Sequence, residues 1–438
     1  MEKTVIELFA GVGGFHLGLK KAGWDVIWAN QWEPGKKVQH AFDCYKSHFP
    51  EVNALNVDIS QVNDHPNQYP IPQTTLLVGG FPCQDYSVAR TKADGIEGKK
   101  GVLFWEISRI LKEKQPPFVL LENVDRLLKS PAKQRGRDFA VMLATFRDLG
   151  YGVEWRVINA ADYGFAQRRR RVFIFAFHES TKYYKKRINQ EKEKILHQAG
   201  FFIKEFPVQK EYSRNHRPYD TVLHEDIVHV SDNFNKDNKE FLFRNSGIMI
   251  NSEIYTEETI PVYVSPKTLS EILEKNVDEK YYLGPNLDDW NYMKGAKKID
   301  RVSKATGHKY QYAEGPVAFP DPLDKPGRTM LTSESSKNRS THVVCDPETG
   351  ELRLLTPVEC ERLNDFDDNW TNTGMPEKFR YFTMGNALVV GLVTKMGETL
   401  KDIIGKESKR KAKTTKASKK ASKNLKDNNT EQLDIFSL

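Results

Sequence analysis

The chain has 438 residues, which exceeds the usual range of a single domain and favours a large core domain with a second module. Lysine and arginine outnumber the acids, 66 against 59, and the net charge of +7 favours a polyanionic partner. No leader-like segment opens the chain and no apolar run of about 18 residues occurs, which excludes a secretory signal and a membrane span from our expectations. We expect a cytoplasmic protein.

The first 178 residues alternate short apolar runs, rich in β-branched and aromatic side chains, with segments of helical spacing. Continuous apolar strands between helices are typical of a sheet that is buried on both faces. We therefore predict an α/β catalytic and ligand-binding domain over 1–178, with a doubly wound, mainly parallel sheet and functional groups at the carboxyl ends of its strands. The expected strands lie at 4–9, 25–29, 75–78, 118–121 and 172–177.

Beyond this first domain the texture of the sequence changes. Residues 179–344 are mostly polar, contain scattered aromatic residues and show only weak hydrophobic periodicity, which predicts a second module. Regularly spaced apolar residues occur again over 345–404, and we expect this segment to complete the first domain. Within 406–427 ten basic residues stand against two acids, and such a composition cannot bury a core. We therefore expect 405–438 to be a disordered basic tail.

A glycine-rich turn, FAGVGG at 9–14, follows the first expected strand and precedes a helix, so a ligand can approach its backbone N–H groups closely. A dinucleotide fingerprint would require glycine where His16 stands, and a P-loop would require Gly-Lys-Ser/Thr, so neither site is expected. Gln31 and Trp32 follow the second strand, where such folds bond a ribose and where an indole can stack on a purine. A tryptophan partly buried at a strand end is the plainer alternative.

Cys83 directly follows Pro82 in GGFPCQ, after the strand at 75–78. The four cysteines are scattered without a CxxC pair, which argues against a disulfide framework or a zinc site, and we expect no metal. Most cytosolic cysteines are small buried apolar residues. Here the flanking glycines and Pro82 predict a rigid bend that directs the thiol toward the expected cleft. Cys83 is therefore a candidate nucleophile.

Two further strand boundaries carry groups that suit catalysis. Glu122 in LLENV directly follows the expected strand at 118–121, where partial desolvation would favour its protonated form. The alternative is a carboxylate that is salt-bridged or solvated. A cysteine and a glutamate at neighbouring strand ends can act as nucleophile and acid on one substrate. Four arginines in QRRRR precede the strand at 172–177, and strand alternation predicts that Arg169 and Arg171 face the same side. A solvated basic face is the alternative.

Six motifs follow one another along the chain: FAGVGG, GGFPCQ, LLENV, QRRRR as Gln-x-Arg-x-Arg, RLLTPVECERL and MGNALVV. Through these motifs the chain resembles the DNA (cytosine-5) methyltransferases of bacterial restriction-modification systems. The resemblance covers nearly all of the chain except the tail. It implies a Rossmann-like domain that binds S-adenosyl-L-methionine as cofactor, and a smaller target recognition domain formed by 179–344.

The resemblance also implies the reaction and its residues. The enzyme would methylate carbon 5 of a cytosine flipped out of double-stranded DNA, because the ring cannot be reached inside the stack. The Cys83 thiolate would attack carbon 6, and Glu122 would bond N3. Arg171, with Arg169, would contact O2 and shape the pocket. The matching motifs supply three further substrate-binding residues: Pro82, Gln84 and Gln167.

For the cofactor, the resemblance assigns the glycine turn, an adenine-stacking tryptophan, an aspartate for the adenine amino group and two residues that close over the methionine end. These residues are Phe9, Gly11, Gly13, Gly14, Trp32, Asp58, Asn386 and Leu388. The family commonly has glutamate where Gln31 stands, so the ribose contact falls to Gln31 or to Glu33. The usual Ser-Val after Gly-Asn reads Ala387-Leu388, which is a mild change in packing.

Three macromolecular partners are expected: double-stranded DNA, a cognate restriction endonuclease and a replication sliding clamp. The clamp rests on the chain end, where QLDIF resembles the short peptides that bind the bacterial clamp. Leu433, Ile435 and Phe436 would fill an apolar groove and Gln432 would make a polar contact, while the linker sets the effective concentration. The alternative is that the apolar residues at the end of the chain match this motif by chance.

Two other functions remain open at this point. The tRNA-modifying branch of the same fold has the same motifs, and only the long polar region favours duplex DNA. A catalytically silent DNA-binding protein is the second alternative. Cys83, Glu122 and Arg171 argue against it, because binding alone needs no nucleophile.

Overall fold

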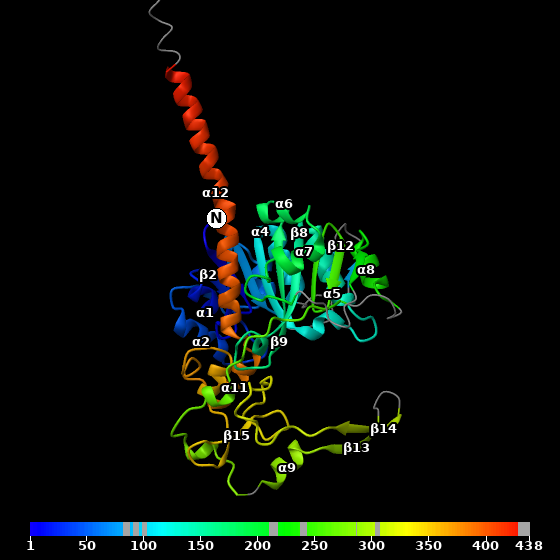
Figure 1. Cartoon of the computed structure of the whole chain (residues 1–438), viewed down its shortest axis with the longest axis vertical. Helices are drawn as coiled ribbons and strands as arrows, with labels where there is room; N and C mark the ends of the chain where they lie inside the picture. Colours follow the sequence, from blue (N-terminus) through cyan, green and yellow to red (C-terminus); the bar gives the residue numbers. More distant parts are fainter. Residues whose placement is uncertain are drawn as a thin grey trace, which may run out of the picture.

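The computed structural model describes residues 1–81, 88–90, 96–98, 103–209, 218–236, 243–285, 287–302 and 307–427; for 88–90, 96–98 and 409–427 it describes the backbone alone. A large domain with a central sheet stands above a smaller domain, and a long helix runs along the large one (Figure 1). The N-terminus lies beside this helix, where the Met1 ammonium group donates to Ser408 Oγ at 3.0 Å.

The central sheet has ten strands in the order β10-β12-β11-β8-β9-β7-β4-β1-β2-β3. The first three in this order are β10 (Tyr219–Val222), β12 (Glu253–Glu257) and β11 (Ser246–Ile250). From β7 to β3 all neighbours are parallel, and their apolar runs are buried on both faces as such strands require. The two following strands, β9 and β8, pair antiparallel. The predicted α/β fold with a mainly parallel sheet is confirmed. These seven strands are β1 (Thr4–Leu8), β2 (Asp25–Asn30), β3 (Asn53–Leu55), β4 (Leu76–Gly80), β7 (Phe118–Val124), β8 (Tyr151–Asn159) and β9 (Arg170–His178).

Helices cover both faces of this sheet and form two hydrophobic cores. On one face Phe104 and Phe139 pack with Ile6 of β1. On the other face Leu19 and Val393 pack with Val5, the preceding residue of the same strand. The first face is covered by α3 (Ile59–Asp64), α4 (Leu103–Lys114), η1 (Asp125–Lys129) and α5 (Arg137–Asp148), and the second by α1 (Gly14–Lys21) and α12 (Val390–Asp427).

Helix α12 returns from the end of the sequence to pack along α1. The contact is close because Gly18 of α1 has no side chain: a Cβ there would lie 2.8 Å from Val393 Cβ. Trp24 Nε1 donates to the Gly397 carbonyl at 2.9 Å. Burial of these apolar residues supplies the main stabilisation of the helix.

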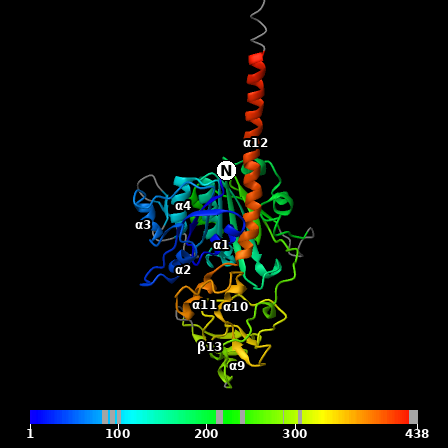
Figure 2. The ribbon, with the colours of Figure 1, turned by 90° about the vertical axis from the view of Figure 1, so that its left-hand side faces the viewer.

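The helix continues past Gly405, where the sequence led us to expect disorder. Its axis projects beyond the large domain to Asp427 (Figures 1 and 2). Lysine and alanine have high helix propensity, so a stretch without a core can still continue a helix that packing has nucleated.

Three strands from the polar region extend the central sheet beyond β8. Antiparallel pairing joins Ile248 of β11 to Glu154 of β8 and Ile254 of β12 to Met249 of β11. The expected boundary at 178/179 therefore does not separate the two domains, since 219–257 belong to the sheet. These strands and the neighbouring helices are β10 (Tyr219–Val222), β11 (Ser246–Ile250), β12 (Glu253–Glu257), α6 (Lys182–Arg187), α7 (Lys192–Lys194), η3 (Ile195–Ala199) and α8 (Ile227–Asn233).

The small domain lies below the carboxyl ends of the parallel strands (Figures 1 and 2). Its core contains Leu269, Met330 and Leu363, and it continues into the large domain through Val12 and Phe49. Its elements are η4 (Leu269–Glu271), η5 (Glu279–Tyr281), α9 (Asp288–Lys294), β13 (Lys297–Val302), β14 (Lys309–Glu314), β15 (Val343–Cys345), β16 (Leu352–Leu354), α10 (Pro357–Leu363) and α11 (Glu377–Asn386).

The expected boundary at 344/345 also cuts through this small domain. Val343 pairs with Leu354, so β15 and β16 form one antiparallel ribbon across it. Arg353 in this ribbon is fully buried, and its guanidinium bonds both Asp346 and Glu359 at 2.6–2.8 Å. Within 345–404 it is α12 that completes the large domain, whereas the preceding residues belong largely to the small one.

Neither a membrane-spanning helix nor a metal-binding cluster occurs in the residues that the structure describes. No described helix is long and apolar enough to cross a bilayer. In the same residues no three His, Cys, Asp or Glu side chains come together as ligands.

Candidate active site

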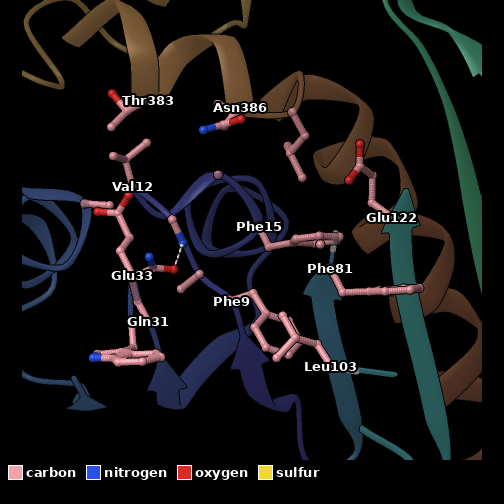
Figure 3. A pocket seen from close by; sticks show the side chains of 18 of the residues that line it. Phe9, Val12, Phe15, Gln31, Glu33, Phe81, Leu103, Glu122, Thr383 and Asn386 are labelled. Atoms are coloured by element: carbon pink, nitrogen blue, oxygen red, sulfur yellow. Dashed lines mark hydrogen bonds between the residues drawn. The ribbon is translucent and has the colours of Figure 1, made fainter. Parts of the chain in front are cut away.

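A cavity of about 750 Å³ opens at the carboxyl ends of β1, β2, β4 and β7. Gln31 and Glu33 lie on one wall and Glu122 on the opposite wall, while Thr383 and Asn386 close it from the small-domain side (Figure 3). The edge where parallel strands end is the usual ligand site of such folds. The cavity therefore lies at the edge of the sheet where we expected functional groups.

The glycine turn between β1 and α1 forms the floor of this cavity. Gly11 has a φ of +57°, and a Cβ there would meet nothing within 4 Å, so its face is open to a ligand. Gly13 does not line the cavity. Its φ is +89°, and a Cβ would lie 2.7 Å from the Phe49 ring, so glycine is required there by the backbone and by packing.

The segment after β2 supplies the polar wall. Gln31 Oε1 accepts a hydrogen bond from the Gly11 backbone N–H at 2.8 Å, which ties the turn to this wall. Trp32 is 38% exposed and lines the cavity, as does Glu33. Asp58 also lines it and caps α3, because its Oδ1 accepts from the Ser60 N–H at 2.9 Å.

The opposite wall holds the catalytic candidates that the structure describes. Pro82, Cys83 and Gln84 lie outside the described residues. The preceding residue, Phe81, lines the cavity, and its carbonyl accepts from Asn123 Nδ2 at 2.7 Å. This bond ties the end of β4 to β7. This role of Asn123 was not predicted from the sequence, although the residue stands within the LLENV motif.

Glu122 and Arg171 form an ion pair in the cavity wall, with Arg171 Nε 2.8 Å from Glu122 Oε1. The register of β7 and β9 produces the pair, since Arg171 lies opposite Val124, two residues after Glu122. Burial raises the pKa of Glu122 above its ordinary value, and the positive charges of Arg171 and Arg169 work against this rise.

Arg169 and Gln167 do not line the cavity. Arg169 donates to the carbonyls of Met330 and Gly385 at 3.2 and 3.0 Å, and Gln167 accepts from the Met330 N–H at 3.1 Å. Both are buried. Exposure alternates along the arginine run as predicted, since Arg168 and Arg170 are exposed whereas Arg169 and Arg171 are not. Both Arg169 and Arg171 lie near enough to Glu122 to act on its charge, but only Arg171 lines the cavity.

The end of α11 completes the cavity. Asn386 and Leu388 line it, and a Cβ on Gly14 would meet the Leu388 side chain at 3.3 Å. The small domain thus contacts the glycine turn directly. Several apolar lining residues were not singled out from the sequence, because an apolar side chain carries no chemical signal there: Val12, Phe15, Phe81 and Leu103.

A buried polar network lies beside the glycine turn. The Tyr45 hydroxyl is 2.8 Å from His16 Nδ1 and 3.3 Å from Glu7 Oε2. Burial raises the pKa of Glu7 to about 8 and lowers the pKa of His16 to about 3. The His16 ring also stacks on Phe49 at 3.5 Å. At neutral pH the network is therefore uncharged, which suits its apolar surroundings.

A Glu7→Gln variant is expected to resist alkaline pH better than the wild type. The folded carboxyl keeps its proton up to about pH 8, whereas the unfolded one loses it near pH 4.3. Unfolding free energy therefore falls between these values, by about 2 kcal/mol from pH 6 to pH 8. Glutamine stays neutral at both pH values, so the unfolding free energy of the variant does not fall for this reason. The drop in Tm between the two pH values, measured by thermal unfolding, should be smaller for the variant.

The matched control is Glu2→Gln, which changes an exposed carboxylate near the same strand. It should behave as the wild type does. Equal drops in Tm for the wild type and Glu7→Gln would show that Glu7 does not titrate in this range.

Comparisons with known proteins agree with the site. The family model for C-5 cytosine-specific DNA methylase matches residues 3–402. The type II methyltransferase M.Sau3AI of Staphylococcus aureus is 53% identical over 405 residues, 91% of this chain and 95% of that protein. M.SsoII of Shigella sonnei is 26% identical over 398 residues, 90% of this chain and 79% of that protein. A crystal structure of a Spodoptera frugiperda DNMT2 mutant has the same fold, with a TM-score of 0.54 at 14% identity over 91% of this chain and 99% of that one.

The resemblance drawn from six motifs is thereby confirmed, and the family fixes the reaction and the methyl donor. The chain belongs to the C-5 cytosine-specific DNA methylases and is a DNA (cytosine-5)-methyltransferase that uses S-adenosyl-L-methionine.

Proposed function

We propose that this enzyme methylates a cytosine flipped out of the DNA duplex, through a covalent adduct of Cys83. The observation that carries the proposal is the Glu122–Arg171 pair in the cavity wall. Glu122 lies across the cavity from the polar wall of Gln31 and Glu33 (Figure 3). It pairs with Gly80 at the end of β4, and Cys83 follows that strand in the sequence. An acid and a cation thus meet in one cavity wall, beside the strand that precedes Cys83 in the sequence.

The cavity fits S-adenosyl-L-methionine in size and in chemistry. Its volume of about 750 Å³ suits a nucleoside-sized ligand. Trp32 offers an aromatic face, and Asp58 offers an acceptor for an amino group. We assign the ribose hydroxyls to Glu33, because Gln31 Oε1 is already engaged by the Gly11 N–H. When bound, the cofactor supplies a methyl group on a positively charged sulfur.

The proposed chemistry at the cytosine begins with the Cys83 thiolate, which forms a sulfur–carbon bond at C6. The ring electrons that are displaced move toward N3, where Glu122 donates its proton or a hydrogen bond, and C5 becomes nucleophilic. C5 would then take up the methyl group that the bound cofactor supplies. The C5 proton would pass to water, Cys83 would leave as thiolate and a proton taken up at N3 would return to Glu122, which restores the aromatic ring.

Arg171 is assigned to the cytosine O2. Glu122 holds its Nε, and the Arg170 carbonyl accepts from its Nη1 at 2.8 Å. Two bonds orient the guanidinium, so its remaining nitrogen is preorganised for a developing negative charge. Arg169 is assigned a positioning role, because its bonds to Met330 and Gly385 hold the small-domain side of the cavity against β9. Gln167 supports the same junction through Met330 and Asn364.

Duplex DNA is supported as substrate by the charge around the cavity. The segments that follow Glu122 and flank Arg171 in the sequence carry exposed basic side chains, which we call the basic rim: Arg126, Lys129, Lys133, Arg135, Arg168 and Arg170. Such a rim suits phosphates. We propose that the small domain reads the target sequence, and that the cavity acts on the base it delivers.

A restriction-modification role is proposed from the relatives named as type II methyltransferases, M.Sau3AI among them. In this role the enzyme would protect DNA in the cytoplasm from a cognate endonuclease that cuts the same sequence.

The clamp hypothesis concerns residues outside the described part of the chain and stands on the sequence alone. We propose that Gln432, Leu433, Ile435 and Phe436 bind a bacterial sliding clamp. A peptide of residues 431–438 should bind purified clamp, whereas a peptide with Leu433 and Phe436 replaced by alanine should not. No binding by the first peptide would rule out the hypothesis.

The experiment that tests the function exposes unmethylated plasmid and, separately, unmodified tRNA to the purified protein and S-adenosyl-L-methionine. Base-resolution sequencing for 5-methylcytosine should show one short methylated motif in the plasmid and no methylation in tRNA. Methylation of tRNA alone would assign the protein to the tRNA-modifying branch. No methylation of either, with DNA binding intact, would favour a silent binder.

A further inference from the structure

We infer that the β13–β14 hairpin is an arm that grips the phosphates of the DNA flanking the target cytosine. This inference rests on the proposed function. The two strands pair antiparallel over six residue pairs, from Lys297 with Glu314 to Val302 with Lys309. Six residues of strand extend about 20 Å, so the arm reaches well beyond the body of the small domain.

The face of the arm that carries Lys298 and Lys309 is open to solvent. The two strands form a separate two-stranded sheet, and every described side chain on this face is exposed, whereas the other face is partly covered where Lys297 lies beside Tyr292 of α9. Val302 is 57% and Tyr310 43% exposed. An isolated two-stranded ribbon is only marginally stable in water. Because this ribbon is largely exposed to solvent, it is a candidate for contact with another molecule.

The charge of the arm indicates which molecule that is. Four cations stand against two carboxylates in 297–302 and 309–314. The carboxylates are engaged within the arm or beside it: Glu314 accepts from the Tyr312 hydroxyl at 2.6 Å, and Asp300 from Gln311 at 3.4 Å. Lys298 and Lys309 are exposed and form no ion pair with any residue that the structure describes.

The opposite face of the arm carries aromatic rings beside cations. Arg301 stacks over the Tyr312 ring at 4.0 Å, and Lys297 lies 4.4 Å from the Tyr292 ring centroid. Tyr292 belongs to α9 and is 65% exposed. Stacking holds these cations extended, which reduces the entropy lost when they bind a phosphate. Both faces therefore offer cations to a polyanion.

The position of the arm fits a duplex that lies along the basic rim. Figure 1 shows the hairpin projecting from the small domain below the lower edge of the large domain, where the parallel strands end. Figure 2 shows the small domain beneath the same edge. The arm is thus directed away from the cavity, so we assign it to flanking phosphates and assign no part of the base recognition to it.

The test compares the full-length wild type with Lys298→Thr/Lys309→Thr, since threonine keeps the strand propensity. Binding of a fluorescent 40-bp duplex that contains the methylated motif, and of one that lacks it, is followed by anisotropy between 50 and 200 mM salt. Loss of two phosphate contacts should flatten the slope of log K against log salt by about 1.8, so the wild type should lose about ten times more affinity than the variant over this range. The threonine variant should methylate the same DNA motif as the wild type.

Two control proteins accompany the variant. Lys298→Arg/Lys309→Arg should keep the wild-type slope, because arginine also binds phosphate. Lys3→Gln/Lys112→Gln removes two exposed charges at the opposite edge of the sheet and should also keep it.

An unchanged slope in the threonine variant would overturn the inference. A changed methylated motif would overturn it as well, because the arm would then read bases. If the wild type bound neither duplex, the proposed function itself would fail, and the inference would fall with it.

Discussion

A Cys83→Ala variant is expected to lose methyl transfer to DNA, by about 10⁴-fold or more, while it still binds duplex DNA and S-adenosyl-L-methionine. In the proposed reaction no step can begin without the sulfur, because C5 of cytosine is a weak nucleophile until C6 is attacked. The residues assigned to the cofactor and to the phosphates are unchanged in this variant, so binding should survive. Incorporation of a labelled methyl group measures the first effect, and titration of each ligand measures the second.

A duplex with 5-fluorocytosine at the target provides a direct test of the covalent adduct. Fluorine does not leave C5 as a proton does, so the wild type should remain attached to this DNA under denaturing conditions. Cys83→Ala should form no such complex. The control is Cys345→Ala, a half-buried cysteine of β15 in the small domain, which should methylate and crosslink normally. Methylation by Cys83→Ala would refute the assignment of the nucleophile.

A Glu122→Gln variant is expected to methylate about 10²–10⁴ times more slowly than the wild type, with little change in cofactor affinity. Glutamine preserves the size of the side chain and can hydrogen-bond N3, but it has no proton to transfer. It also removes the charge that binds Arg171 Nε at 2.8 Å, so the guanidinium loses one of its two orienting bonds. Single-turnover rates with saturating DNA and cofactor measure the effect.

The pH dependence should show which form of Glu122 acts. Burial raises its pKa, so the protonated form persists to higher pH than in an exposed carboxyl. A rate that requires this form falls as pH rises through the folded pKa, whereas formation of the Cys83 thiolate increases the rate with pH. The wild type should therefore show a rate maximum, and Glu122→Gln should lack the decline on its alkaline side.

The control for this variant is Glu205→Gln. Glu205 also bonds cations in a partly exposed position, since Lys204 and Lys395 lie 3.5 and 3.7 Å away, but it is in contact with α12 and does not line the cavity. Its replacement should leave the rate unchanged. A Glu122→Gln variant with the wild-type rate would show that N3 is protonated by another group.

The sequence by itself determined the elements whose signals are local. The parallel strands were readable because burial on both faces demands continuous apolar runs, as in β4 and β7. The glycine turn was readable because Gly11 and Gly13 need backbone conformations that other residues rarely adopt. Glu122 and Trp32 were identifiable because they stand at strand ends, and the carboxyl ends of parallel strands meet at one edge.

The tertiary structure alone decided what depends on distant partners. Arg169 and Arg171 are two residues apart in an arginine run, yet one lies buried between Met330 and Gly385 and the other pairs with Glu122 in the cavity. Nothing local separates them, because their partners come from three other segments of the chain. The strands in 219–257 escaped prediction for the same reason: antiparallel strands at a sheet edge are short, and their pairing with β8 is a long-range contact that leaves little periodicity in the sequence.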